Sequence, residues 1–159
     1  MSHERKEYGD FQALAPDAYE SVRALGTLAA KAGIDKSLLE LVKLRASQIN
    51  GCTFCVQFHI LQAERLGVDV DKLNLVVVWR EAPQFSPRER AALAWTEALT
   101  LLAGGVGDDV YEQARAEFSD KELTYLTSAI ASINVWNRFG VAYRWTPPVR
   151  QKSVGAAVS

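Results

Sequence analysis

The apolar residues of this chain recur mostly three and four positions apart, and strand-like alternation between turn residues is nearly absent. This spacing places apolar side chains along one face of a helix. Signals that begin helices support the pattern: Ser86, Pro87 and Glu89 combine a capping serine, a proline suited to the first helical turn and a glutamate that completes a capping box. Ser119 and Glu122 form a second such box. The sequence therefore predicts an all-α fold.

The helix signals also divide the chain into segments. We expect about six to seven helices, at residues 16–33, 35–51, 52–67, 73–80, 86–102, 108–118 and 119–141. The segment 73–80 has the β-branched composition of a strand, but a strand without a partner leaves its backbone unpaired, so a short helix is expected. A length of 159 residues suits a single domain, which we place at residues 1–148. Residues 149–159 lack periodicity and are expected to form a mobile C-terminal tail.

Charge and hydropathy exclude two classes of partner. With 18 basic and 19 acidic residues, the chain has a formal net charge of −1 and no global field that would attract nucleic acid or an anionic membrane surface. The longest apolar run, residues 75–79, is far shorter than the roughly 20 residues that cross a bilayer. The first residues lack the apolar segment of a secretory signal. We therefore expect a cytoplasmic protein with neither nucleic acid nor membrane as a partner.

Both cysteines of the chain lie in one Cys52-Thr53-Phe54-Cys55 motif at the start of an expected helix. Free N–H groups and the positive end of the helix dipole stabilise a thiolate there. His59 lies four residues after Cys55, one turn along the same face, where an imidazole can accept the thiol proton. Cys52 is near enough to form a disulfide once Cys55 has been oxidised to a sulfenic acid. The spacing is typical of a peroxidatic and resolving cysteine pair.

Structural alternatives stand beside this interpretation. Two buried cysteines can pack as small apolar side chains without reacting. The motif could supply two zinc ligands, but a structural zinc site needs about four ligands, and the only other histidine, His3, lies in a polar N-terminal stretch. His59 alone is more often a half-buried histidine with satisfied hydrogen bonds. Its spacing from Cys55 favours a role as a base, and no metal is expected.

Glu40 lies among apolar residues of the expected helix before the motif. Its carboxylate could turn inward and orient the imidazole of His59. However, Lys36 and Lys43 are four and three residues away, so an exposed ion pair on the helix surface is the default interpretation. Three polar residues near the helix junction are expected to cap it or cover its surface: Ser47, Gln48 and Asn50.

Residues 40–59, continued by 63–68, closely resemble the alkylhydroperoxidase D-like branch of the carboxymuconolactone decarboxylase family. The resemblance includes an acidic residue twelve positions before Cys52, the pair Asn50-Gly51, and a histidine four positions after Cys55. Residues 134–139 are similar to the family's C-terminal helix. The resemblance implies the family's all-α fold and a homo-oligomer, such as a trimer or a hexamer. The decarboxylase branch generally lacks the cysteine pair, so retaining both cysteines argues against that branch.

Carried over by position, the resemblance implies roles for four residues. Cys55 resembles the peroxidatic cysteine and Cys52 the resolving cysteine, while His59 is similar in position to the base that deprotonates Cys55. Glu40 resembles the carboxylate that serves the proton relay. Phe54 departs from the family pattern, which has a histidine just before the second cysteine. Because a phenyl ring cannot transfer a proton, this departure leaves the rate and the substrate open.

The residues and the resemblance together give one leading hypothesis and two alternatives. We expect a dithiol peroxidase that reduces alkyl hydroperoxides through a Cys55 sulfenic acid and a Cys52–Cys55 disulfide. An external dithiol must restore the thiols, and the resemblance points to a lipoylated protein. The alternatives are a dithiol-disulfide oxidoreductase with a non-peroxide acceptor, and a non-enzymatic helical oligomer or redox sensor. The sequence has neither a dinucleotide fingerprint nor a phosphate-binding glycine loop, so no cofactor is expected.

Overall fold

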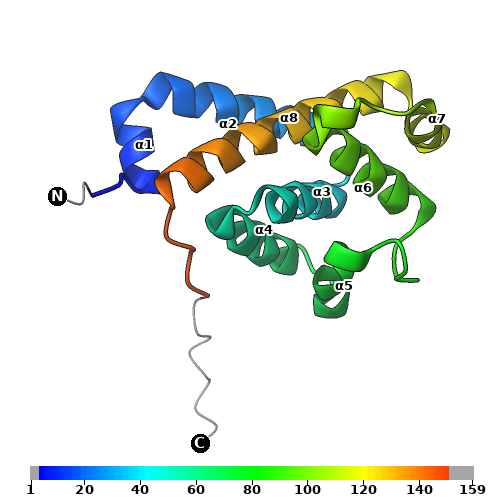
Figure 1. Cartoon of the computed structure of the whole chain (residues 1–159), viewed down its shortest axis with the longest axis horizontal. Helices are drawn as coiled ribbons and strands as arrows, with labels where there is room; N and C mark the ends of the chain where they lie inside the picture. The colour runs from blue at the N-terminus through cyan, green and yellow to red at the C-terminus, as the bar shows by residue number, and fades with distance from the viewer. Residues whose placement is uncertain (1–3, 151–159) are drawn as a thin grey trace, which may run out of the picture.

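The computed structural model describes residues 4–150, which form a single all-helical domain (Figure 1). Its α-helices are α1 (Tyr8–Leu14), α2 (Pro16–Lys31), α3 (Lys36–Asn50), α4 (Thr53–Arg65), α5 (Val70–Leu75), α6 (Pro87–Thr100), α7 (Asp108–Glu117) and α8 (Asp120–Tyr143). Two short 3-10 helices are also present, Val76–Val78 and Leu102–Gly104. The described residues contain no strand, so the predicted all-α class is confirmed, although α1 raises the number of helices above the expected six to seven.

The long helix α8 is the axis of the fold. It packs against α2, α3, α4 and α6, and in Figure 1 it runs alongside α2, with α3 and α4 below the two of them. Its buried face is mainly apolar and includes Leu126, Ala129, Ile130 and Ile133. Burial of such a face, rather than intrinsic helix propensity, supplies most of the stability of a helix in a folded protein.

A tight corner between α3 and α4 places the cysteine motif. Asp35 caps the start of α3 by accepting a hydrogen bond from the backbone N–H of Leu38 at 2.9 Å. The helix ends at Gly51, whose φ of 69° lies in the left-handed region that glycine adopts without strain. The next residue, Cys52, is already the N-cap of α4. The helix end predicted at Asn50-Gly51 and the helix start predicted at Cys52 are therefore confirmed.

The signals in the sequence do not predict α1. This helix has 7 residues, and isolated helices shorter than about 12 residues are marginal in water. Tertiary packing stabilises it instead, because Phe11 is buried and Tyr8 and Phe11 join an aromatic cluster with Tyr19 and Trp145. The existence of α1 therefore depends on contacts with distant parts of the chain.

The segment predicted as a short helix at residues 73–80 is helical but differs in its bounds. It begins as α5 at Val70, after an Asp69 cap that accepts from the backbone N–H of Asp71 at 2.7 Å, and ends in the 3-10 helix Val76–Val78. Only Val76 of the three valines is buried. The β-branched run therefore supplies one core side chain and no strand.

Some expectations concern features beyond the described fold. No helix within residues 4–150 is long and apolar enough to cross a membrane. The cytoplasmic location and the homo-oligomer stay predictions. Most of the predicted mobile tail lies outside the described residues, which end at residue 150.

We expect the capping box of α8 to contribute measurably to stability. Ser119 Oγ accepts a hydrogen bond from the N–H of Glu122 at 3.3 Å, and the Glu122 carboxylate accepts one from the N–H of Ser119 at 2.9 Å. Replacing the serine with Ser119→Ala should lower the free energy of unfolding by about 1 kcal/mol, because an N–H at the helix start loses its acceptor. Urea denaturation measures the change. Ser128→Ala is the control, since that hydroxyl donates only to a carbonyl within α8; equal losses in the two variants would contradict the capping role.

Candidate active site

The two cysteines lie at the amino end of α4 and are joined by a disulfide in this structure. Cys52 is the N-cap, and its Sγ accepts a hydrogen bond from the backbone N–H of Cys55 at 3.2 Å. Only 1% of Cys52 and 3% of Cys55 is exposed. In the reduced protein, free N–H groups and the positive end of the helix dipole favour a thiolate at this position. The predicted placement of the dithiol at a helix start is confirmed, and its chemical roles stay predictions.

Helix α8 lies close to the disulfide at Gly140, which is buried. A methyl group at this position would lie 2.5 Å from Cys52 Sγ and 3.3 Å from Cys55 Sγ. The first separation is far shorter than van der Waals contact between carbon and sulfur, so a residue without Cβ is needed for this packing. The backbone of α8 therefore covers the sulfur atoms on one side.

Glu40 turns inward from α3 and holds His59 of α4. Glu40 Oε2 lies 2.6 Å from His59 Nδ1, and Lys43 Nζ donates to Glu40 Oε1 at 2.8 Å. Only 8% of Glu40 and 8% of His59 is exposed. The default expectation of an exposed ion pair is therefore wrong. Lys43 does pair with Glu40, but the carboxylate is buried, because donors from two side chains replace the water that it loses.

Burial and hydrogen bonding set the protonation of this pair. Burial lowers the pKa of His59 below its usual range, and the neighbouring Glu40 carboxylate offsets this only in part. For Glu40, burial raises the pKa, but the hydrogen bonds and charges of His59 and Lys43 outweigh it and leave the pKa lowered. At neutral pH, His59 is therefore a neutral imidazole beside an ionised carboxylate. The proton lies on Nδ1, which donates to Glu40, and the lone pair lies on Nε2.

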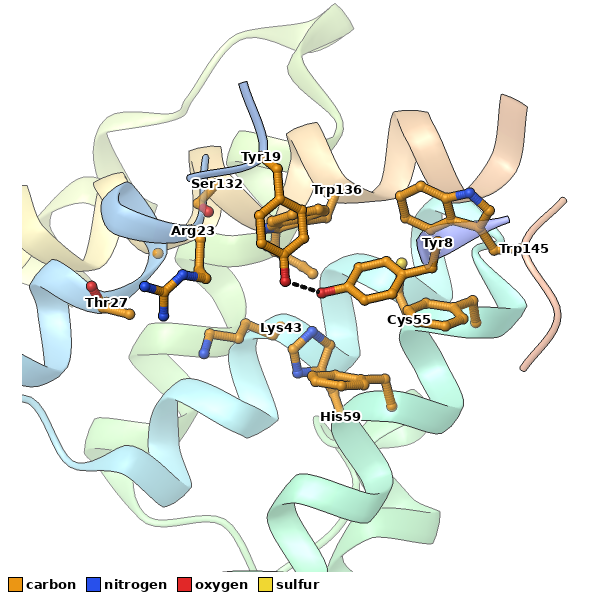
Figure 2. A pocket seen from close by; sticks show the side chains of 14 residues that line it. Tyr8, Tyr19, Arg23, Thr27, Lys43, Cys55, His59, Ser132, Trp136 and Trp145 are labelled. Atoms are coloured by element: carbon orange, nitrogen blue, oxygen red, sulfur yellow. Dashed lines mark hydrogen bonds between the residues drawn. The ribbon is translucent and has the colours of Figure 1, made fainter. Parts of the chain in front are cut away.

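A cavity of about 350 Å³ opens beside Cys55 and His59 (Figure 2). Cys55 lines the cavity and Cys52 does not, so a small molecule in the cavity meets the sulfur of Cys55 first. Six of the 14 lining residues are aromatic: Tyr8, Tyr19, Phe54, Phe58, Trp136 and Trp145. The cavity therefore combines a cysteine, an imidazole and an apolar surface suited to an organic substrate.

Sequence reasoning missed most of this aromatic wall. Tyr8 belongs to α1, Tyr19 to α2, and Trp145 follows α8. Tyr8 stacks on Phe54 of the cysteine motif with ring centroids 5.0 Å apart, and its hydroxyl lies 2.8 Å from that of Tyr19. Four tryptophans in the chain indicate an aromatic-rich interior but not its location. No local pattern connects these residues, because only the tertiary fold brings them together.

Ser47 and Asn50, at the corner between α3 and α4, have a structural role, but they join α3 to α8 instead of capping the junction or covering its surface, and Ser47 is fully buried. Ser47 Oγ donates to the carbonyl of Lys43 at 2.7 Å and accepts from Asn137 Nδ2 at 3.0 Å. Asn50 Nδ2 donates to the side-chain oxygens of Asn134 and Asn137, both at 2.9 Å. These hydrogen bonds tie α3 to α8 and so fix the corner that carries the cysteines.

Metal ligands do not gather in the part of the chain that the structure describes. No group of three or more His, Cys, Asp or Glu side chains there could hold an ion. The two cysteines are bonded to each other, and Glu40 and His59 are hydrogen-bonded to each other. The chemistry that this arrangement supports is that of a dithiol with a neighbouring base.

Comparisons with known proteins agree with this architecture. The model of the carboxymuconolactone decarboxylase family matches residues 16–98. The uncharacterised protein YdfG of Bacillus subtilis (strain 168) is 31% identical over 130 residues, which make up 81% of this chain and 88% of that protein. A protein of unknown function from Agrobacterium tumefaciens, with a suggested role as an antioxidant defence protein AhpD, has a crystal structure that superposes with a TM-score of 0.83. The two sequences are 39% identical, and the match covers 93% of this chain and 100% of that one. A peroxidase-related protein from Ralstonia eutropha JMP134 with an alkylhydroperoxidase AhpD core shares the fold, with 21% identity, a TM-score of 0.76, and 86% and 74% of the two chains covered.

We expect Gly140→Ala to destabilise the oxidised protein more than the reduced protein. The added methyl group meets a disulfide that cannot rotate away, whereas a reduced Cys52 side chain can. Overpacking of this kind costs about 1–3 kcal/mol, which exceeds the gain of about 1 kcal/mol expected from replacing glycine by alanine within a helix. Urea denaturation of both redox states measures the difference.

Gly9→Ala is the matched control for this variant, because a Cβ at Gly9 in α1 meets no atom within 4 Å. It should leave the difference between the two redox states unchanged. Wild-type stability of oxidised Gly140→Ala would show that the disulfide does not need this close approach.

Proposed function

The chain belongs to the carboxymuconolactone decarboxylase family, in its alkylhydroperoxidase D-like branch, and from this we propose that it is a peroxidase that reduces alkyl hydroperoxides with Cys52 and Cys55. One observation carries the proposal: Cys55 and His59 line the same cavity, and Glu40 holds the imidazole from the other side. The antioxidant role suggested for the Agrobacterium protein, at 39% identity, supports it.

The reaction begins with the reduced protein. His59 accepts the thiol proton of Cys55 at Nε2, and the Glu40 carboxylate stabilises the imidazolium that forms. The Cys55 thiolate then attacks the distal oxygen of the peroxide, so that an S–O bond forms and the O–O bond breaks. Sulfur is oxidised to a sulfenic acid. The peroxide is reduced to an alcohol, whose oxygen takes up the proton released from the thiol.

Cys52 completes the oxidative half of the cycle. Its sulfur attacks the sulfenic sulfur of Cys55 and releases water, which gives the disulfide. The Cα atoms of the two residues are 5.3 Å apart, within the range of about 4.4–6.8 Å that disulfides span.

Two electrons must then come from another molecule. Both cysteines are almost fully buried, and α8 covers one side of them, so a reductant has to reach Cys55 through the cavity. A slender dithiol, such as the lipoyl arm of a lipoylated protein, fits this access better than a dithiol fixed on a protein surface. We therefore infer a small or arm-borne dithiol as the partner.

The two alternative functions have less support. A folded protein disulfide would have to bring its sulfur in line with Cys55, and burial of 97% or more of each cysteine stands against that. A purely structural or sensor role does not account for a neutral imidazole, held by a buried carboxylate, on the wall of the same cavity. Peroxide reduction uses each of these features.

We expect Cys55→Ser to abolish the consumption of tert-butyl hydroperoxide in the presence of dihydrolipoamide. The rate should fall by about 100-fold or more, because a serine hydroxyl is hardly ionised at neutral pH and is a far weaker nucleophile than a thiolate. The loss of peroxide absorbance or reaction with ferrous xylenol orange measures the rate.

Cys52→Ser is the matched variant, with the nucleophile kept and the resolving sulfur removed. It should reduce one equivalent of peroxide and stop at a sulfenic acid on Cys55, which dimedone traps for mass spectrometry. A wild-type rate in Cys55→Ser would remove the proposed function, and a trapped sulfenic acid on Cys52 in the wild type would reverse the two roles.

A further inference from the structure

Two tyrosine hydroxyls meet inside the aromatic part of the cavity. Tyr8 Oη and Tyr19 Oη are 2.8 Å apart, and Figure 2 shows them pointing toward each other on the side of the cavity where His59 lies. Each hydroxyl carries one proton, and the hydrogen bond between them uses one of the two. The described residues offer neither hydroxyl a second hydrogen-bond partner. One O–H of the pair is therefore available to donate to a molecule in the cavity.

Tyr8 is the member of the pair that lies against the cysteine motif. Its ring stacks on Phe54 at 5.0 Å with an interplanar angle of 25°, whereas Tyr19 packs against Phe11, and both tyrosines contact Trp136. Phe54 has no exchangeable proton. The hydroxyl of Tyr8, whose ring stacks on Phe54, supplies an exchangeable proton in the cavity that Cys55 lines.

The peroxidase reaction requires such a proton. When the O–O bond of an alkyl hydroperoxide breaks, the proximal oxygen leaves as an alkoxide, which is a strong base and a poor leaving group. Arg23 and Lys43 also line the cavity and can attract that charge, but the leaving oxygen must still take up a proton, so a proton donor at this oxygen lowers the barrier.

We propose that Tyr8 is a further catalytic residue, whose hydroxyl protonates the leaving oxygen of the hydroperoxide. This inference rests on the proposed peroxidase function. As the Cys55 thiolate bonds to the distal oxygen and becomes a sulfenic acid, the proximal oxygen takes the Tyr8 proton and departs as an alcohol. The proton that His59 removed from Cys55 then returns to the Tyr8 phenolate. The sum is one thiol and one hydroperoxide converted to one sulfenic acid and one alcohol.

Tyr8 is suited to donate at neutral pH. Burial, followed by the hydrogen bond to Tyr19, raises the pKa of Tyr8 above its ordinary value. The hydroxyl therefore stays protonated between turnovers. An alkoxide is a stronger base than a tyrosine phenolate, so the transfer remains favourable even with the raised pKa.

The test compares two oxidants that differ in their leaving group. Tert-butyl hydroperoxide releases an alkoxide, which needs a proton, whereas peracetic acid releases acetate, which does not. We expect Tyr8→Phe to slow single-turnover oxidation of the reduced protein by tert-butyl hydroperoxide by about 100-fold or more, in the range of one general acid. Oxidation by peracetic acid should change by less than about 3-fold, since it needs no general acid. Tryptophan fluorescence in a stopped-flow instrument follows both reactions.

Three further measurements complete the design. Tyr111→Phe, at a 40% exposed tyrosine on α7, should leave both rates unchanged. Tyr19→Phe keeps the Tyr8 proton and should slow the alkyl hydroperoxide less than Tyr8→Phe does. In the unsubstituted protein, the solvent deuterium isotope effect should be larger with tert-butyl hydroperoxide than with peracetic acid, which tests the same step even if Tyr8→Phe folds poorly.

The outcomes separate the two proposals. Equal slowing of Tyr8→Phe with both oxidants, or no slowing with either, would overturn the role of Tyr8 while leaving the peroxidase intact. A leaving-group-selective loss confined to Tyr19→Phe would overturn the choice of Tyr8 as donor. A wild-type protein that reacts with neither oxidant would overturn the proposed function, and the role of Tyr8 with it.

Discussion

The hydrogen bond between the Glu40 carboxylate and His59 Nδ1 controls the chemistry available at the cysteines. The carboxylate remains ionised in a buried place because His59 and Lys43 both donate to it. An ionised Glu40 in turn fixes the neutral imidazole tautomer whose lone pair lies on Nε2. Removing one partner of such a buried hydrogen bond typically costs about 1–3 kcal/mol, because the group that remains loses a partner that water cannot replace. Folding and the proposed catalysis therefore depend on the same contact.

The parts of the site that depend on local signals could be predicted from the sequence. Gly51 ends one helix and Cys52 caps the next, so the dithiol has to lie at a helix start. Helix geometry then places Cys55 and His59, which are four residues apart, on the same face of α4. The direction of the Glu40 side chain could not be derived in the same way, because a glutamate near two lysines can lie at the protein surface as readily as in the core. Its burial depends on His59, which is 19 residues away in the chain and belongs to another helix.

The aromatic residues that line the cavity could not be predicted from the sequence for a different physical reason. Tyr8 is in a helix of 7 residues that has little stability on its own. Its contacts with Phe54 and Trp145 form only when α1 folds back onto the ends of α4 and α8. Neither periodicity nor capping reports a cluster of this type. A residue near the amino terminus, Tyr8, can thus contribute to a site whose cysteine motif lies more than 40 residues later in the chain.

The pH dependence of Cys55 oxidation in a single turnover tests most directly whether His59 is the base. Because burial lowers the pKa of His59, we expect the wild-type rate to be at its plateau near neutral pH and to fall only below about pH 6.5, the ordinary histidine pKa. In His59→Gln, whose amide can still donate to Glu40, the rate should keep rising toward about pH 8.5, the ordinary pKa of a thiol. Superimposable profiles from two folded proteins would contradict the role of His59 as the base.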